Sequence, residues 1–202
     1  MSGYFEPVGG PGGGAAVALD EVEISILRSL ATQLLELIGP GPGGESDDPL
    51  DALFAEGPSE PPGDPALARL FPDAYGAPGA AGDEESARKS AEFRRFTEGD
   101  LRARKREDLL ALVRSLDSVA AEAREAGPAG GAVLTLGAED SRRWLVALND
   151  LRLTIGSRLG IEDEDTGEKL FELPDDDPMK PLVMAYFWLG GLQESLVETL
   201  MP

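Results

Sequence analysis

Apolar residues recur three and four positions apart along most of the chain, and stretches rich in Gly, Pro and acidic residues interrupt this spacing. Such a period predicts amphipathic helices that bury one apolar face. Asp20 with Glu23 has the spacing of a capping box, Asp64 precedes a proline at the start of a second helix, and Gly39 ends the first. The expected helices cover residues 20–38, 64–71, 84–96, 97–126 and 138–159, followed by a last helix that begins at Pro178 or Pro181.

The boundary at residue 97 rests on the run Thr97-Glu98-Gly99-Asp100, which resembles a second capping box. We therefore expect one helix to end there and a longer one to begin. Phe93 and Phe96 are expected on the inner side of the first of these two helices. The buried stripe of the second is expected to contain Leu101, Leu109, Leu112, Val113, Leu116, Val119, Ala120 and Ala123.

Three short segments have the character of strands. Residues 4–6 and 15–19 flank a glycine-rich turn and predict a loose hairpin, and residues 133–136 form the third candidate. The second and third candidates each lead directly into a helix, which suggests that they lie side by side. The fold class that follows is mainly α, a helical bundle of about six helices with a small two- to three-stranded sheet.

The chain reads as a single domain over residues 1–202 with three interruptions. Residues 39–63 and 72–82 are expected to be flexible Gly/Pro-rich loops, the first with a short helical turn at residues 49–54. Residues 161–177 are expected to form an acidic loop. The acidic runs in this segment do not match the spacing of a calcium-binding loop, so we read them as solvated.

The composition limits the kinds of catalytic and metal-binding site that the chain can form, because its 202 residues include neither Cys nor His. This excludes thiol nucleophiles, disulfides, imidazole acid–base catalysis and the usual zinc ligand sets. The glycine runs lack the residues of a phosphate-binding loop. No catalytic residue, cofactor site or metal site is predicted, and a binding or regulatory role is favoured over an enzyme.

The formal net charge of −20 favours basic protein partners and disfavours direct binding to nucleic acid or to anionic membranes. No signal peptide is visible at the start of the sequence. The longest apolar run, residues 182–192, is about half the ~20 residues that a membrane span needs. We expect a cytoplasmic protein.

A basic cluster stands out in this acidic chain between residues 88 and 106. It is either a docking patch, with Arg94, Arg95 and Arg102 as its candidate contacts, or a solvated helix face with local ion pairs. Glu85–Lys89 and Glu98–Arg102 have the i,i+4 spacing of such pairs.

The predicted helix at residues 138–159 carries an apolar stripe that begins at Trp144, beside an unusual density of polar groups. The candidate partner-binding residues here are Asn149, Asp150, Arg152 and Arg158. In the alternative interpretation, Arg152 pairs with a carboxylate of a facing helix and Asn149 bonds a loop carbonyl. Gly190-Gly191 in the last helix indicates close helix packing, a kink or a seam for a homodimer.

Several segments of the chain share one resemblance, which is strongest from Asn149 to Gly160. The other segments are Phe5-Glu6-Pro7, the helix from Leu19 to Ile38, the segment from Asp64 to Tyr75, Glu92-Phe93-Arg94-Arg95-Phe96-Thr97, Trp188-Leu189 and Leu192-Gln193-Glu194-Ser195-Leu196. Together they resemble one actinobacterial family, the AosR-type oxidative-stress transcriptional regulators, long catalogued as a domain of unknown function and encoded near the ClpS protease adaptor.

The resemblance implies a regulator that acts through a sigma factor or RNA polymerase, with redox control by a cysteine pair in some members. That sensing chemistry does not carry over to a chain without cysteine. The function we expect is therefore a non-enzymatic, protein-binding regulator, most consistent with transcription. The alternatives are a partner in ClpS-linked proteolysis or cysteine and sulfur metabolism, and a structural homodimer with no switching function.

Overall fold

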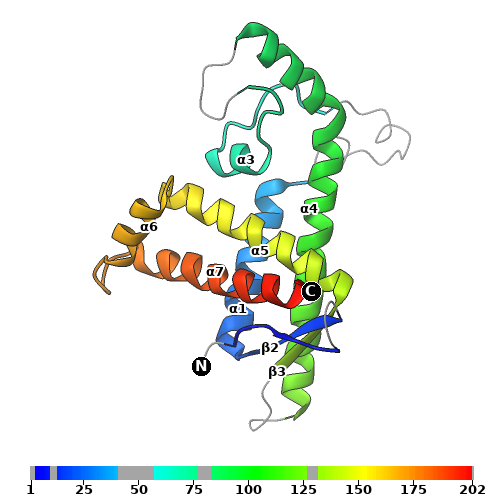
Figure 1. The fold of residues 1–202 in the computed structure, drawn as a ribbon, viewed down its shortest axis with the longest axis vertical. Helices are drawn as coiled ribbons and strands as arrows, with labels where there is room; N and C mark the ends of the chain where they lie inside the picture. Colours follow the sequence, from blue (N-terminus) through cyan, green and yellow to red (C-terminus); the bar gives the residue numbers. More distant parts are fainter. Residues whose placement is uncertain (1–2, 10–12, 41–56, 77–82, 127–131, 202) are drawn as a thin grey trace.

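The computed structural model describes residues 3–9, 13–40, 57–76, 83–126 and 132–201. In these ranges the chain forms six helices and one small three-stranded antiparallel sheet, which lies near one end of the molecule (Figure 1). This confirms the mainly helical fold with a small sheet. The helical turn expected at residues 49–54 lies outside the described residues.

The sheet joins β1 (Glu6–Pro7), β2 (Gly14–Leu19) and β3 (Ala132–Gly137) in that order, with both pairs antiparallel. Ala16 is the register partner of Glu6 on one side and of Thr135 on the other. Alternate residues of β2, such as Val17, point into the core, as expected for a sheet with one covered face. The hairpin and the side-by-side placement of the two longer strands are confirmed.

Helix α1 (Glu21–Ile38) begins and ends where the sequence predicts. The Asp20 carboxylate accepts a hydrogen bond from the backbone N–H of Glu23 at 2.8 Å, and the Glu23 carboxylate accepts one from the N–H of Asp20 at 2.9 Å. This reciprocal capping box satisfies two N–H groups that the helix leaves unpaired. At the other end Gly39 has a φ of 67°, which glycine adopts without strain.

The two helices expected on either side of residue 97 are a single helix, α4 (Glu84–Ala126), so that prediction is wrong. Its 43 residues span about 65 Å. The Thr97 hydroxyl donates to the carbonyl of Phe93 one turn earlier and caps nothing. Buried side chains at positions 94, 98 and 102 interact across the expected break, which outweighs the cost of about 1 kcal/mol for Gly99 within a helix.

The inner and outer faces of the N-terminal half of α4 are the reverse of the prediction. Phe93 and Phe96, expected inside, are 47% and 69% exposed, whereas Arg94 and Glu98 are 4% and 3% exposed. Leu101, expected in the buried stripe, is also exposed. The C-terminal half follows the expectation, with a buried stripe of Leu109, Leu112, Leu116 and Val119.

Helix α5 (Ala138–Leu159) lies at the centre of the fold. It contacts α1, α4, two strands, the short helix α3 (Pro65–Leu70) and α7 (Lys180–Leu200), which runs beside it across the molecule (Figure 1). Asp64 caps α3 as predicted, by accepting from the N–H groups of Ala66 and Leu67.

The described part of the chain holds no helix with the length and hydropathy that a membrane span requires.

The segment expected to be an acidic loop, residues 161–177, contains helix α6 (Glu164–Phe171). Asp163 caps it by accepting from the N–H and the hydroxyl of Thr166 at 2.8 and 2.6 Å. Phe171 at its end packs edge-on against Phe187 of α7. Capping and this aromatic contact give the acidic run a regular structure that its charge alone did not indicate.

Trp144 anchors the core where α5 meets the sheet and α4. Its side chain is 1% exposed, its ring packs edge-on against Phe5 with centroids 5.9 Å apart, and its indole N–H donates to Ser115 at 2.9 Å. The Phe5 backbone N–H is held in turn by the hydroxyl of Ser195 on α7. One side chain therefore links the N-terminus, α4 and α5.

We expect Trp144→Ala to lower the free energy of unfolding by about 3–5 kcal/mol, because it leaves a cavity in the core and removes the hydrogen bond from the indole to Ser115. Urea denaturation followed by circular dichroism measures the change. Val146→Ala is the matched control on the same helix, where the side chain is 42% exposed, and it should change stability by less than about 0.5 kcal/mol. Equal effects of the two substitutions would contradict this assignment.

Candidate functional site

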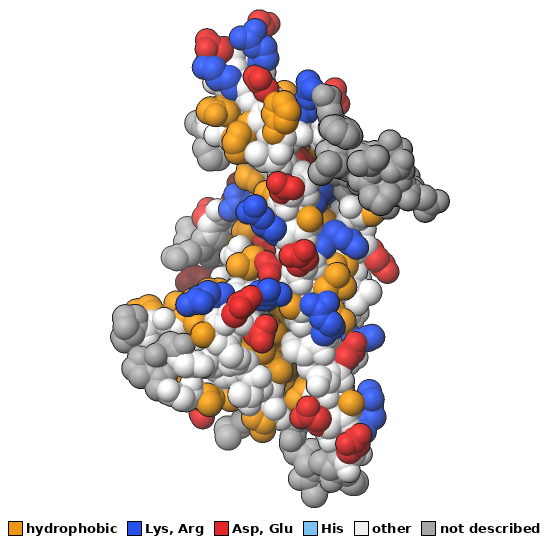
Figure 2. Space-filling view, turned by 90° about the vertical axis from the view of Figure 1, so that its right-hand side faces the viewer, with side chains coloured by type: hydrophobic (Ala, Val, Ile, Leu, Met, Phe, Trp, Pro, Cys, Tyr) orange, Lys and Arg blue, Asp and Glu red, His pale blue; other side chains and the backbone are white. Residues whose placement is uncertain are grey.

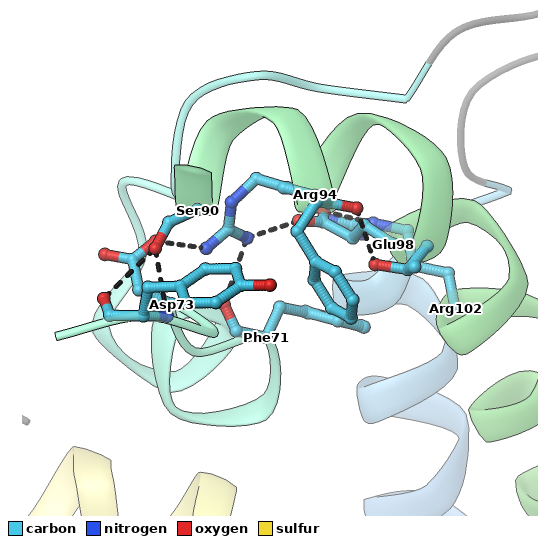
Figure 3. A network of polar contacts seen from close by, with 9 residues as sticks. Phe71, Asp73, Ser90, Arg94, Glu98 and Arg102 are labelled. Carbon is cyan, nitrogen blue, oxygen red and sulfur yellow. Dashed lines mark hydrogen bonds and ion pairs between the residues drawn. The ribbon is translucent and has the colours of Figure 1, made fainter. Parts of the chain in front are cut away.

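Part of the basic cluster of α4 is directed into the protein, where two of its arginines form a ladder of charged side chains with a glutamate (Figure 3). Glu98 lies between Arg94 and Arg102, each one helical turn away, and pairs with both. Arg102 donates from Nε at 2.9 Å and from Nη2 at 2.7 Å to the same carboxylate oxygen. We call Arg94, Glu98 and Arg102 the arginine ladder.

One end of the arginine ladder closes the C-terminus of α1. Arg102 donates to the carbonyl of Ile38 at 2.6 Å, and Arg106 one turn further donates to the carbonyls of Leu35 and Gly39, both at 3.0 Å. The carbonyl of Leu35 also accepts the capping N–H of Gly39 at 3.1 Å, and the negative end of the helix dipole attracts cations such as these guanidinium groups. Two of the basic residues thus stabilise a helix end.

The other end of the arginine ladder holds the segment that follows α3. Arg94 donates to the carbonyl of Phe71 at 3.0 Å and to the carboxylate of Asp73 at 2.9 Å. The hydroxyl of Ser90 accepts from the N–H of Tyr75 and donates to its carbonyl, each at 3.1 Å. In Figure 3 the guanidinium of Arg94 lies between Asp73 and Glu98, and the centroid of the Phe71 ring lies 4.4 Å from the guanidinium carbon of Arg102.

Asp150, a predicted partner-binding residue, is also internal. It is 1% exposed and accepts from Lys105 of α4 at 2.7 Å, while its second carboxylate oxygen is buried without a hydrogen bond. Burial raises the pKa of Asp150 above its ordinary value, and the nearby ammonium of Lys105 offsets only part of this effect. Burial likewise raises the pKa of Asp108, one turn beyond Lys105.

The remaining candidates of the basic cluster and of α5 lie nearer the surface. The guanidinium of Arg95 lies over the exposed ring of Phe96, 5.7 Å from its centroid. Phe93 packs edge-on against Tyr75, with centroids 6.2 Å apart. Figure 2 shows hydrophobic side chains next to charged ones near the end of the molecule where α4 begins. Arg158 pairs with the capping residue Asp64 at 2.7 Å and so ties α5 to α3.

Asn149 and Arg152 form a network with α7 that sequence reasoning missed. Arg152 donates from Nη1 to the amide oxygen of Gln193 at 2.7 Å, and the amide nitrogen of Gln193 donates to Asn149 at 3.4 Å. The guanidinium carbon lies 5.1 Å from the centroid of the Tyr186 ring. The partners are an amide and an aromatic ring in place of the expected carboxylate and loop carbonyl.

A cavity of about 800 Å³ opens beside this network, between α5, Tyr186 and the segment that the arginine ladder holds. Asn149 and Arg152 line it, whereas the other five candidate residues do not. Its charged and polar lining also includes residues that the sequence analysis did not single out: Arg69, Asp73, Tyr75, Ser157, Glu162 and Tyr186. Their spacing carries no local signal, because they come from three stretches of the chain, residues 69–75, 157–162 and 186, which meet only through the packing of α3 and α7 on α5.

The lining of the cavity contains groups that are suited to binding. In the described ranges no group of three or more acidic side chains is placed to hold a metal ion. The cavity lining combines guanidinium, amide and hydroxyl groups with aromatic rings. Such a combination orients a bound group by hydrogen bonds and covers its apolar part.

Comparison with known proteins identifies a family that the chain matches. Residues 5–200 match the family described as Domain of unknown function (DUF2017). The chain is 31% identical over 186 residues to proteins named Oxidative stress regulator AosR from Mycobacterium tuberculosis strain H37Rv and Mycobacterium bovis, covering 89% of this chain and 78% of theirs. It is 31% identical over 191 residues to the Putative oxidative stress regulator AosR of Mycobacterium leprae, covering 89% and 79%. No solved structure matches the chain.

We expect Glu98→Gln to lower the free energy of unfolding by about 3–5 kcal/mol, because it removes the charge that compensates two arginines largely withdrawn from solvent. Urea denaturation measures this change. Glu85→Gln is the control: it breaks only an exposed pair with Lys89 on the same helix and should change stability by at most about 1 kcal/mol. A small effect at Glu98 would show that the ladder is not structural.

The raised pKa of Asp150 also predicts a dependence on pH. The folded protein holds this proton more tightly than the unfolded chain, so the contribution of Asp150 to stability falls as pH rises from its ordinary pKa of 3.8 through the raised value. Across that window, the stability of Asp150→Asn relative to the wild type should therefore increase with pH. Urea denaturation at a series of pH values tests the sign, with Asp140→Asn, exposed on the same helix, as control. A relative stability that decreases with pH would contradict the prediction.

Proposed function

Because this chain belongs to the DUF2017 family and its relatives are named oxidative stress regulators, we propose that it is a non-enzymatic regulator of the oxidative-stress response that works by binding a protein. The observation that carries the proposal is the extent of the similarity, which covers 89% of the chain. The partner we propose is a sigma factor or RNA polymerase in the cytoplasm, so that regulation acts on transcription.

A thiol cannot be the sensor in this regulator, since the chain has no cysteine. Formation of a disulfide within the chain, or between it and a partner through this chain's own sulfur, is therefore excluded. The signal has to arrive by another route, such as the concentration of a ligand, the state of the partner or the amount of this protein. In this respect the proposed mechanism differs from control by a cysteine pair.

A protein partner fits the surface better than DNA does. The net charge of −20 repels phosphate groups. Arg94 and Arg102, which a basic docking patch would need, are engaged inside the protein. The outer face of the same helix instead presents the exposed rings of Phe93 and Phe96, and aromatic side chains are enriched at the centres of protein interfaces. We propose this face of α4 as the docking surface.

Affinity capture of the tagged full-length chain from cells, followed by mass spectrometry, tests the proposal. We expect a sigma factor or an RNA polymerase subunit to be recovered. If the lysate is treated with the thiol oxidant diamide and fresh partner is then added, we expect this chain to bind the partner as well as it does without the oxidant. Recovery of the ClpS adaptor or protease components would support the alternative role in proteolysis. Light scattering that shows a stable dimer with no captured partner would support a structural homodimer.

The docking surface is tested separately with the double variant Phe93→Ser and Phe96→Ser. It should weaken capture at least about tenfold, the size expected for the loss of interface aromatics. Val22→Ser on α1, where the side chain is 65% exposed, is the matched control and should capture the partner normally. If the double variant also captures the partner normally, α4 does not provide the docking surface.

A further inference from the structure

Two arginines that line the cavity have no carboxylate partner among the described residues. Arg69 comes from α3 and Arg152 from α5, and neither takes part in an ion pair. This is unexpected in a chain with 38 acidic and 18 basic residues, in which Asp64 and Asp73 beside the cavity already pair with other arginines. The cavity therefore contains two guanidinium groups that no carboxylate of the described residues pairs with, although the protein as a whole is strongly negative.

Arg152 is held in place but uses little of its hydrogen-bonding capacity. A guanidinium has five N–H donors, and within the described residues one of them, on Nη1, bonds Gln193. Nε is buried and has no partner. The face of the group lies against the ring of Tyr186, which orients its plane.

Two glycines make room for this stacked pair. A Cβ at position 190 would lie 3.5 Å from Nε of Arg152, and a Cβ at position 156 would lie 3.2 Å from the edge of the Tyr186 ring. The second distance is too short for comfortable packing, so a larger residue at position 156 would displace the ring. The backbone on both sides is thus shaped to accept a guanidinium stacked on a phenol.

We propose that the cavity binds a small organic monocarboxylate, whose carboxylate is held by Arg152 and whose apolar body lies along the wall formed by Leu153, Ile161 and Tyr186. Guanidinium and carboxylate are complementary in shape and charge. The volume of about 800 Å³ lies within the range of small-molecule sites. This inference concerns ligand binding and does not depend on the protein partner proposed above.

The charges around the cavity limit the ligand to one acidic group. Asp73 is neutralised by Arg94, whereas Arg69 and Glu162 carry opposite charges at exposed positions, so solvent screens the effect of both. Arg152 is the one half-buried cation among the lining residues, and it can pair with one carboxylate. A dicarboxylate or phosphate is therefore expected to bind less well than a monocarboxylate.

Isothermal titration calorimetry of the full-length chain tests this with sodium phenylacetate and sodium hexanoate at constant ionic strength. We expect saturable binding of one molecule per chain by at least one of them. Phenylacetamide, which has the same shape without the charge, succinate and inorganic phosphate should each bind at least about tenfold more weakly, because a charge-assisted bond at a single site is lost or opposed. An acetylated hexapeptide that ends in phenylalanine tests whether the bound carboxylate belongs to the C-terminus of a peptide or to a small free acid.

Arg152→Gln should weaken binding at least about tenfold. Arg152→Lys should bind more tightly than Arg152→Gln but less tightly than the wild type, because lysine keeps the positive charge but lacks the paired N–H donors of the guanidinium. Arg142→Gln on an exposed position of the same helix is the matched control and should bind as the wild type. Circular dichroism and amide NMR spectra establish that each variant is folded, and ligand-induced NMR shifts should centre on α5 and Tyr186. The proposal is overturned by no saturable binding of either acid, by equal binding to Arg152→Gln, or by tighter binding of phosphate, succinate or the hexapeptide.

Discussion

The buried pairing of Glu98 with Arg94 and Arg102 determines how the upper half of the molecule is assembled. A carboxylate withdrawn from water needs both charge and hydrogen bonds to compensate it, and here two guanidinium groups supply them from adjacent turns of α4. The remaining donors of the same arginines reach the end of α1 and the segment after α3. A single carboxylate therefore positions three parts of the chain.

This internal polar face explains why α4 is one helix and why its aromatic residues lie outside. Because the side chains at 94, 98 and 102 point inward, the helix geometry places Phe93 and Phe96 on the opposite side. A surface with exposed aromatic rings then results directly from a charged interior. The same interaction supports the cavity, since Asp73 and Tyr75 of its wall are fixed by Arg94 and Ser90.

Helix α5 connects these features to the core. One of its faces buries Trp144 and the leucine stripe, while another presents Asn149 and Arg152 to α7 and to the cavity. In a protein without cysteine, a ligand that contacts Arg152 would touch the helix that packs against nearly every other element.

The sequence by itself determined several helix ends, the strands and the family. The capping residues Asp20 and Asp64, the strand pattern of residues 15–19 and the Trp144 stripe each contain their own signal, and the fold class followed from them. The absence of thiol and imidazole chemistry was equally plain. Short-range patterns of this kind depend on residues within the same turn or strand, so they can be recognised in the sequence alone.

Only the tertiary structure decided which charged residues are inside. Arg94 and Phe93 are adjacent, and no local rule says that the guanidinium is buried and the ring exposed; the carbonyls and carboxylates that accept from Arg94 come from residues up to 23 positions away. Tyr186 and Gln193 meet Arg152 across about 40 positions. Long-range partners of polar groups are set by packing, and packing alone assembled the cavity from stretches of the chain that are far apart in the sequence.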